Sequence, residues 1–127
     1  MMKQRVSITL QDYRGSIIRL SIGLLEVLDY PRYVRLLMNQ ETLELGIQPT
    51  NKDDIKGLKV LYTKTSSTSG ANICSKITIS KIYEMLSLEE NHTYRVKQYK
   101  ISDGIAIFSL SSAYDVSKMN MRKANDQ

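Results

Sequence analysis

The sequence contains few of the residues that form disulfides, bind metals or fill large aromatic cores. It has one cysteine, one histidine, one phenylalanine and no tryptophan. Cys74 alone cannot form an intrachain disulfide, which favours a cytoplasmic protein. No stretch approaches the roughly 18 consecutive apolar residues of a membrane span. We therefore expect no membrane partner.

The same scarcity argues against an enzyme. His92 has no cysteine near it for a zinc site, and its polar surroundings predict an exposed side chain. Cys74 lacks an evident base partner for nucleophilic catalysis. The adjacent Asp53 and Asp54 lack the further oxygen ligands that a hard cation requires. We therefore predict a non-enzymatic protein without a metal or other cofactor.

The overall composition is that of a globular protein with a basic surface. Apolar residues make up 42% of the 127 residues, which is enough for a core. The formal net charge is +5, and the pI is about 9.3. A positive surface favours anionic partners such as nucleic acid, nucleotides or acidic proteins. An ordinary soluble surface that happens to be basic is the alternative.

Alternating apolar and polar residues predict strands in the first half of the chain. Ser21 is suited to cap a short helix that contains Leu24, Leu25 and Leu28 and ends before Pro31. The strands are expected over residues 4–12, 16–20, 33–38 and 43–47, with a further one over 58–62.

The pattern returns after a small polar stretch, residues 63–70, which we interpret as a linker. A second helix, capped by Ser75 or Ser80, is predicted to run to Leu86. Around it we expect strands over 72–74, 93–99 and 105–110, and then a polar tail over 114–127.

Together the two halves predict an α+β fold of two related β-α-β-β units with short helices. The units cover residues 1–62 and 71–113, and the first has an extra N-terminal strand. One such unit cannot cover its own apolar face, so two must pack together or dimerise. We therefore also predict a homo-oligomer.

Three short stretches carry a family resemblance: Arg14-Gly15-Ser16-Ile17-Ile18, Leu20-Ser21 opening a helix, and residues 43–49. They resemble the AbrB-type swapped-hairpin modules of bacterial transition-state regulators, and tandem copies are similar to the MraZ type. The resemblance implies a DNA-binding transcriptional regulator. Residues 33–37 and the last strand, leading to Ser112-Ala113, are also similar to small proteins of Firmicutes and their phages, which implies no activity.

Basic residues supply the candidate binding site. If the units pack about a pseudo-twofold axis, Arg14 and Arg19 could share a face with Lys76 and neutralise phosphates. The alternative is solvated strand faces paired with nearby glutamates. The candidate nucleic-acid-binding or anion-binding residues are Arg14, Arg19, Arg35, Lys76, Arg95 and Lys97.

Tyrosines support a second hypothesis of a different class. Beside arginines, their rings could hold a nucleotide or a single strand, although such rings also pack against cores with only the hydroxyl exposed. The chain would then be a phage-type accessory or anti-defence protein that sequesters a small anionic ligand or inhibits a host protein. The tyrosines concerned are Tyr30, Tyr33, Tyr62, Tyr83, Tyr94 and Tyr99.

Overall fold

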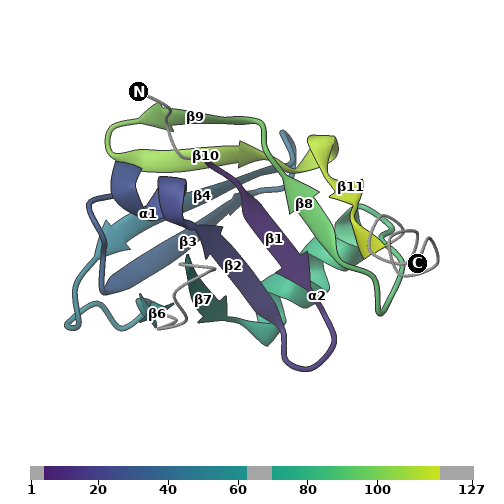
Figure 1. Ribbon diagram of the computed structural model, residues 1–127, viewed down its shortest axis with the longest axis horizontal. Coiled ribbons are helices and arrows are strands. Elements are labelled where there is room, and N and C mark those ends of the chain that lie inside the picture. Colours follow the sequence, from purple (N-terminus) through teal and green to yellow (C-terminus); the bar gives the residue numbers. More distant parts are fainter. Residues whose placement is uncertain (1–4, 63–69, 118–127) are drawn as a thin grey trace, which may run out of the picture.

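The computed structural model describes residues 5–62 and 70–117, and within them the chain forms two antiparallel sheets and two short α-helices (Figure 1). This confirms the predicted α+β class, with more β than α. The six-stranded sheet has the order β11 (Tyr114–Asp115), β8 (Tyr94–Val96), β1 (Ile8–Gln11), β2 (Ile17–Ser21), β7 (Gly70–Cys74), β6 (Leu61–Tyr62). The five-stranded sheet has the order β5 (Leu58–Lys59), β3 (Tyr33–Asn39), β4 (Glu44–Thr50), β10 (Ile105–Ser109), β9 (Tyr99–Ser102).

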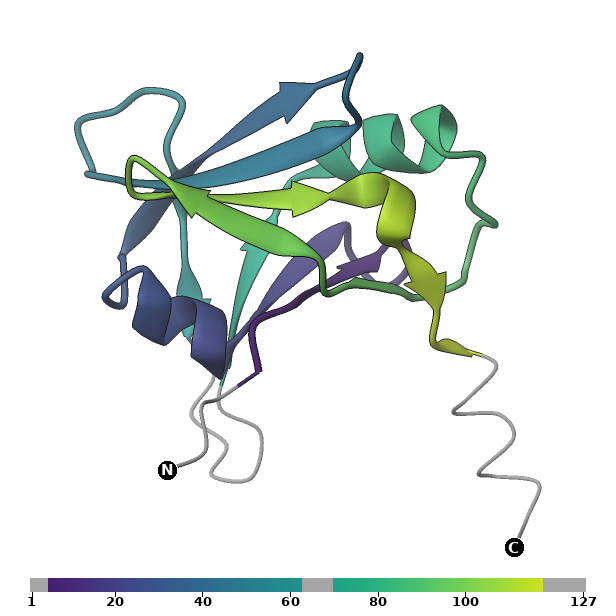
Figure 2. The ribbon, with the colours of Figure 1, turned by 90° about the horizontal axis from the view of Figure 1, so that it is seen from above.

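The helices α1 (Ile22–Val27) and α2 (Lys76–Met85) lie at opposite ends of the molecule (Figure 2), and a 3₁₀ turn, η1 (Leu110–Ser112), follows β10. The Ser21 hydroxyl accepts from Leu24 N, which confirms the predicted cap. Of the two serines considered for the second helix, Ser75 is the cap. No helix in the described ranges has the length and apolar character needed to cross a membrane.

One hydrophobic core joins both halves of the chain. It includes Leu20 and Leu24 from the first half, and Ile82 and Phe108 from the second, all fully buried. The apolar faces that one predicted unit could not cover by itself are therefore covered within a single chain. The homo-oligomer stays a prediction.

Strands from the two halves of the chain pair with one another. β2 pairs with β7, so that Ile18 lies opposite Ile73. β4 pairs with β10, so that Gly46 lies opposite Ile107. Both pairs are antiparallel, so each sheet contains strands from both halves of the chain.

The two helices end in the same way. Asp29 N donates to Glu26 O, and Tyr30 N donates to Leu25 O; Ser87 N and Leu88 N make the same bonds to Glu84 O and Tyr83 O. The residue after each C-cap is left-handed, with φ of 61° at Asp29 and 51° at Ser87. This is the Schellman type of helix end, which satisfies the last carbonyls of the helix.

The strand predicted over residues 93–99 is wrong in its extent. Tyr94 and Val96 face the core in β8, but Lys97 and Gln98 leave the strand, and Tyr99 starts β9 in the other sheet. Continued alternation would bury the Gln98 amide, which is costly without a hydrogen-bond partner. The chain crosses between the sheets at that point instead.

A similar crossing divides the strand predicted over residues 58–62. β5 belongs to one sheet and β6 to the other, and buried Val60 stands between them. Residues 63–69 of the predicted linker lie outside the described residues, and Gly70 begins β7. The tail predicted from residue 114 begins as strand β11, and its next residue, Val116, is buried.

Replacing Tyr83 by phenylalanine is expected to destabilise the fold by about 1–2 kcal/mol. The Tyr83 hydroxyl lies 2.6 Å from His92 O and 3.2 Å from Leu10 O, and joins α2 to the six-stranded sheet. Burial raises the pKa of this phenol, so it remains a donor at neutral pH. The variant leaves part-buried carbonyl groups without that donor. Urea denaturation followed by circular dichroism measures the loss.

Tyr99→Phe is the matched control for this substitution. Tyr99 is 42% exposed, and its ring packs against Phe108 at 5.8 Å between centroids. Loss of an exposed hydroxyl is expected to change stability by less than about 0.5 kcal/mol. Equal stabilities for the two variants would contradict a structural role for the Tyr83 hydrogen bonds.

Candidate functional site

A continuous row of side chains crosses the outer face of the six-stranded sheet. Arg95 of β8 and Arg19 of β2 both pair in register with Thr9 of β1, so the two arginines flank one threonine. Tyr114 extends the row beyond Arg95, while Asn72 and then Leu61 extend it beyond Arg19. With strands about 4.8 Å apart, the Cα atoms of the two arginines lie roughly 10 Å apart.

The row faces outward because the alternate positions are buried. Ile8 and Leu10 of β1, and Ile18 and Leu20 of β2, are fully buried, which leaves the intervening residues on the solvent side. Among the outward strand positions described for this sheet, none is an aspartate or a glutamate. The described strand positions on this face therefore carry positive but no negative side chains.

The two arginines make long hydrogen bonds to neutral groups of the row. Arg95 Nε donates to Thr9 Oγ1 at 3.5 Å, and Arg19 Nη1 donates to Asn72 Oδ1 at 3.4 Å. Bonds of this length are weak. They orient the guanidinium groups over the sheet.

Beside the row, three cations surround a small hollow of about 280 Å³. Arg5, Arg95 and Lys97 line it together with Val6 and Ser7. Within residues 5–62 and 70–117, none of the three cations forms an ion pair. We call Arg5, Arg19, Arg95 and Lys97 the basic face.

An aromatic ring lies next to the basic face. The ammonium of Lys97 is 5.3 Å from the centroid of the Tyr114 ring, within the range of a cation–π contact. Tyr114 is half-buried at the edge of the sheet. The face therefore offers a partly exposed ring as well as charge.

The Ser21 hydroxyl helps to position Arg5. It accepts from Leu24 N as the cap of α1, accepts from Ser7 N at 2.9 Å, and donates to Arg5 O at 2.9 Å. One side chain thus holds the backbone that precedes β1 against the junction of β2 and α1. The residue that caps α1 thus also holds the backbone of Arg5 in the basic face.

The other predicted basic residues lie elsewhere. Arg14 is exposed in the loop between β1 and β2, with a left-handed φ of 54°. Lys76 is exposed at the start of α2. Ser75 N donates to Ser16 O, so Arg14 and Lys76 lie at one end of the β2–β7 pair, whereas Arg19 lies within it. The predicted grouping of Arg14, Arg19 and Lys76 is therefore spread along β2.

Arg35 is engaged by a carboxylate. Its Nη2 and Nε donate to the two oxygens of Asp54 at 2.8 and 3.0 Å, a bidentate pair on the outer side of β3. The hydrogen bond from Arg35, followed by one from Lys56 N, lowers the pKa of Asp54 to about 2. Asp54 is thus ionised at neutral pH and competes with any phosphate for Arg35.

The residues considered for metal binding or catalysis do not converge. His92 Nδ1 lies 2.6 Å from Asp115 Oδ2, and Nε2 lies 2.9 Å from Glu89 Oε2, so the ring is half-buried between carboxylates rather than simply exposed. Burial opposes ionisation of Asp115, but hydrogen bonds from His92 and Ser117 outweigh it and lower the pKa of this carboxyl. In the described part of the chain, no three His, Cys, Asp or Glu side chains form a group that could hold a metal ion.

Sequence reasoning identified Arg19, Arg95 and Lys97 but missed Arg5, Thr9, Asn72 and Tyr114. Residues 5, 7 and 9 share the polar side of the first alternating stretch, so the period alone could have indicated Arg5 and Thr9. Asn72 and Tyr114 join the row only through strand pairing, which no local pattern shows.

Comparison of the chain with protein-family models, with curated proteins and with solved structures finds no match. The function proposed below therefore depends on the geometry of these residues.

Proposed function

We propose that the chain is a non-enzymatic, DNA-binding regulator whose basic face contacts the phosphate backbone. The observation that carries this proposal is the row Arg95–Thr9–Arg19 on an outward sheet surface without acidic strand residues. Arginine and lysine neutralise phosphates and release counterions, which supplies most of the affinity in sequence-independent binding.

A swapped-hairpin relationship between the two halves would support the same function. We propose that the two halves are related swapped-hairpin units of the AbrB type. Support comes from the antiparallel pairing of corresponding strands, β2 with β7 and β4 with β10, and from the matching ends of α1 and α2. The second half also contains β8, which pairs with the extra N-terminal strand β1.

The salt dependence of DNA binding tests the proposal. Each neutralised phosphate contributes about −0.9 to the slope of log K against log salt, so four cations predict a slope of about −3.6. Affinity for a random-sequence duplex should then fall about 100-fold between roughly 50 and 200 mM salt. Fluorescence anisotropy with a labelled duplex measures both quantities. Absence of binding at the lower salt concentration, or a slope near zero, would reject the proposal.

A further inference from the structure

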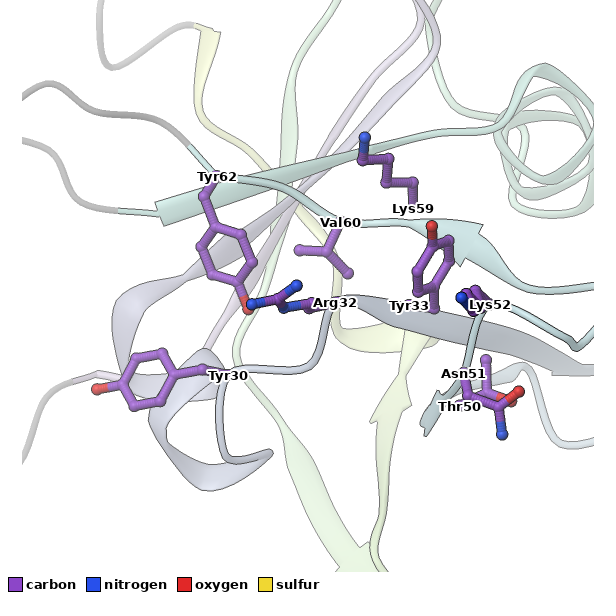
Figure 3. Close-up of a pocket in the computed structure, with 9 residues that line it drawn as sticks. All are labelled: Tyr30, Arg32, Tyr33, Thr50, Asn51, Lys52, Lys59, Val60 and Tyr62. Carbon is purple, nitrogen blue, oxygen red and sulfur yellow. The ribbon is translucent and has the colours of Figure 1, made fainter.

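A second, larger cavity of about 820 Å³ opens where β3 begins, β4 ends and the chain passes from β5 to β6. None of its lining residues belongs to the basic face. Figure 3 shows Tyr30 and Tyr62 on one side, with the Arg32 guanidinium beside the Tyr62 hydroxyl, and Tyr33, Lys52, Thr50 and Asn51 on the other. Lys59 and Val60 complete the lining.

The charge of this cavity is positive. Arg32, Lys52 and Lys59 line it, and no lining residue is an aspartate or a glutamate. Within residues 5–62 and 70–117, none of these three cations takes part in an ion pair. The cavity is therefore suited to an anion with several charges.

One of the two acidic residues that follow Lys52 in the chain is already engaged. Asp54 follows Lys52 by two residues, but both of its oxygens receive hydrogen bonds from Arg35, and Oδ2 also accepts from the Thr50 hydroxyl. The Asp54 carboxylate is thus paired with Arg35 rather than with a cation of the cavity.

Tyrosines supply flat surfaces around the charge. The Tyr62 hydroxyl donates to Pro31 O at 2.6 Å, which fixes the ring while leaving the side chain 41% exposed. Burial raises the pKa of the Tyr62 phenol, which keeps this donor protonated at neutral pH. Tyr30 is 52% exposed, and its backbone is held by the bond from its N–H to Leu25 O, 2.7 Å long.

The floor of the cavity is rigidly connected to both sheets. Val60 is buried, and its N–H donates to Arg32 O at 2.9 Å, so the segment between β5 and β6 is tied to the residue that precedes β3. Tyr33 pairs in register with both Thr50 and Lys59. Arg32, Lys59 and Tyr62 therefore come from segments whose backbones are held by hydrogen bonds or strand pairing, which lowers the entropy cost of binding.

We propose that this cavity binds a nucleoside diphosphate or triphosphate. Arg32, Lys52 and Lys59 would contact the phosphates, and the base would stack on Tyr30 or Tyr62. Arginine and lysine form the strong, charge-assisted bonds that phosphate oxygens favour. Exposed aromatic rings bind the π-face of any base. The volume lies within the range of about 300–1,000 Å³ that small-molecule sites occupy.

Isothermal titration calorimetry at low salt with ADP, GDP and CDP tests the proposal, with inorganic pyrophosphate and adenosine as separate probes. The diphosphates should bind with a Kd below about 1 mM, and more tightly than either pyrophosphate or adenosine. No binding of any diphosphate would overturn the proposal. Pyrophosphate binding as tightly as ADP would also overturn it, because the rings would then contribute nothing.

Variants separate the contributions of charge and ring. Arg32→Gln and Lys59→Gln should each weaken ADP binding about 10-fold, since a hydrogen bond to a charged group is worth about 1.5 kcal/mol or more. Tyr30→Leu should weaken ADP binding but leave pyrophosphate binding unchanged. Lys81→Gln, an equal loss of charge on the exposed side of α2, is the matched control. Thermal unfolding of each variant checks that it folds, and equal weakening by Lys81→Gln would contradict a specific site.

Discussion

A Phe108→Ala variant is expected to lose about 3–5 kcal/mol of stability, the largest effect that we predict for a single substitution. Phe108 is fully buried, lies opposite buried Leu45 across the β4–β10 pair, and contacts the Tyr99 ring. The cavity left by its removal would lie at the pairing between the two halves. Both halves should therefore be destabilised together.

Urea denaturation, followed by circular dichroism and by tyrosine fluorescence, measures this effect. A single coincident transition at lower urea is expected, because one core cannot be divided without exposing both halves. Ile107→Ala, on the opposite and half-buried face of the same strand, should cost less. Two separate transitions in the wild-type protein would contradict the shared core.

Reversing the charge of both central arginines is expected to weaken duplex DNA binding by about 100-fold or more. Each arginine contributes a charge-assisted contact worth about 1.5–3 kcal/mol, so two losses correspond to at least two orders of magnitude. Arg19→Glu combined with Arg95→Glu also adds repulsion at the centre of the basic face. The slope of log K against log salt should become shallower at the same time.

The control for this double variant carries the same change in net charge elsewhere. Lys81 lies on α2, and Lys100 lies on the edge strand β9, 3.8 Å from Glu44. Lys81→Glu combined with Lys100→Glu should reduce DNA affinity far less than the double arginine variant. If both double variants weaken binding equally, affinity depends on total charge and not on the row across the sheet.

The parts of the fold that depend on residues close together in the sequence were predictable. Ser21 and Ser75 satisfy N–H groups three residues ahead, so the caps are local chemistry. The order of strand, helix and hairpin followed from the periods of two and of 3.6 residues. The crossings at Val60 and at Lys97–Gln98 were missed, because a strand that changes sheet keeps its alternation on either side of the break.

The candidate site was predictable only in part, because its residues are joined by pairing across long sequence separations. Arg95 and Thr9 are 86 residues apart, and no alternating pattern shows that they lie side by side. Arg35 was included as a phosphate contact because its charge was visible, whereas its partner Asp54 lies 19 residues away beyond a loop. Charge alone therefore identifies candidate residues without showing which of them another side chain already engages.

The pairing of β2 with β7 and of β4 with β10 also determines how the molecule responds to dilution. In an assembly of separate copies, such contacts would dissociate at low concentration by mass action. Here both strands of each pair belong to one polypeptide, and the connecting chain keeps their effective concentration high. Dilution alone should therefore not separate these two pairs of strands.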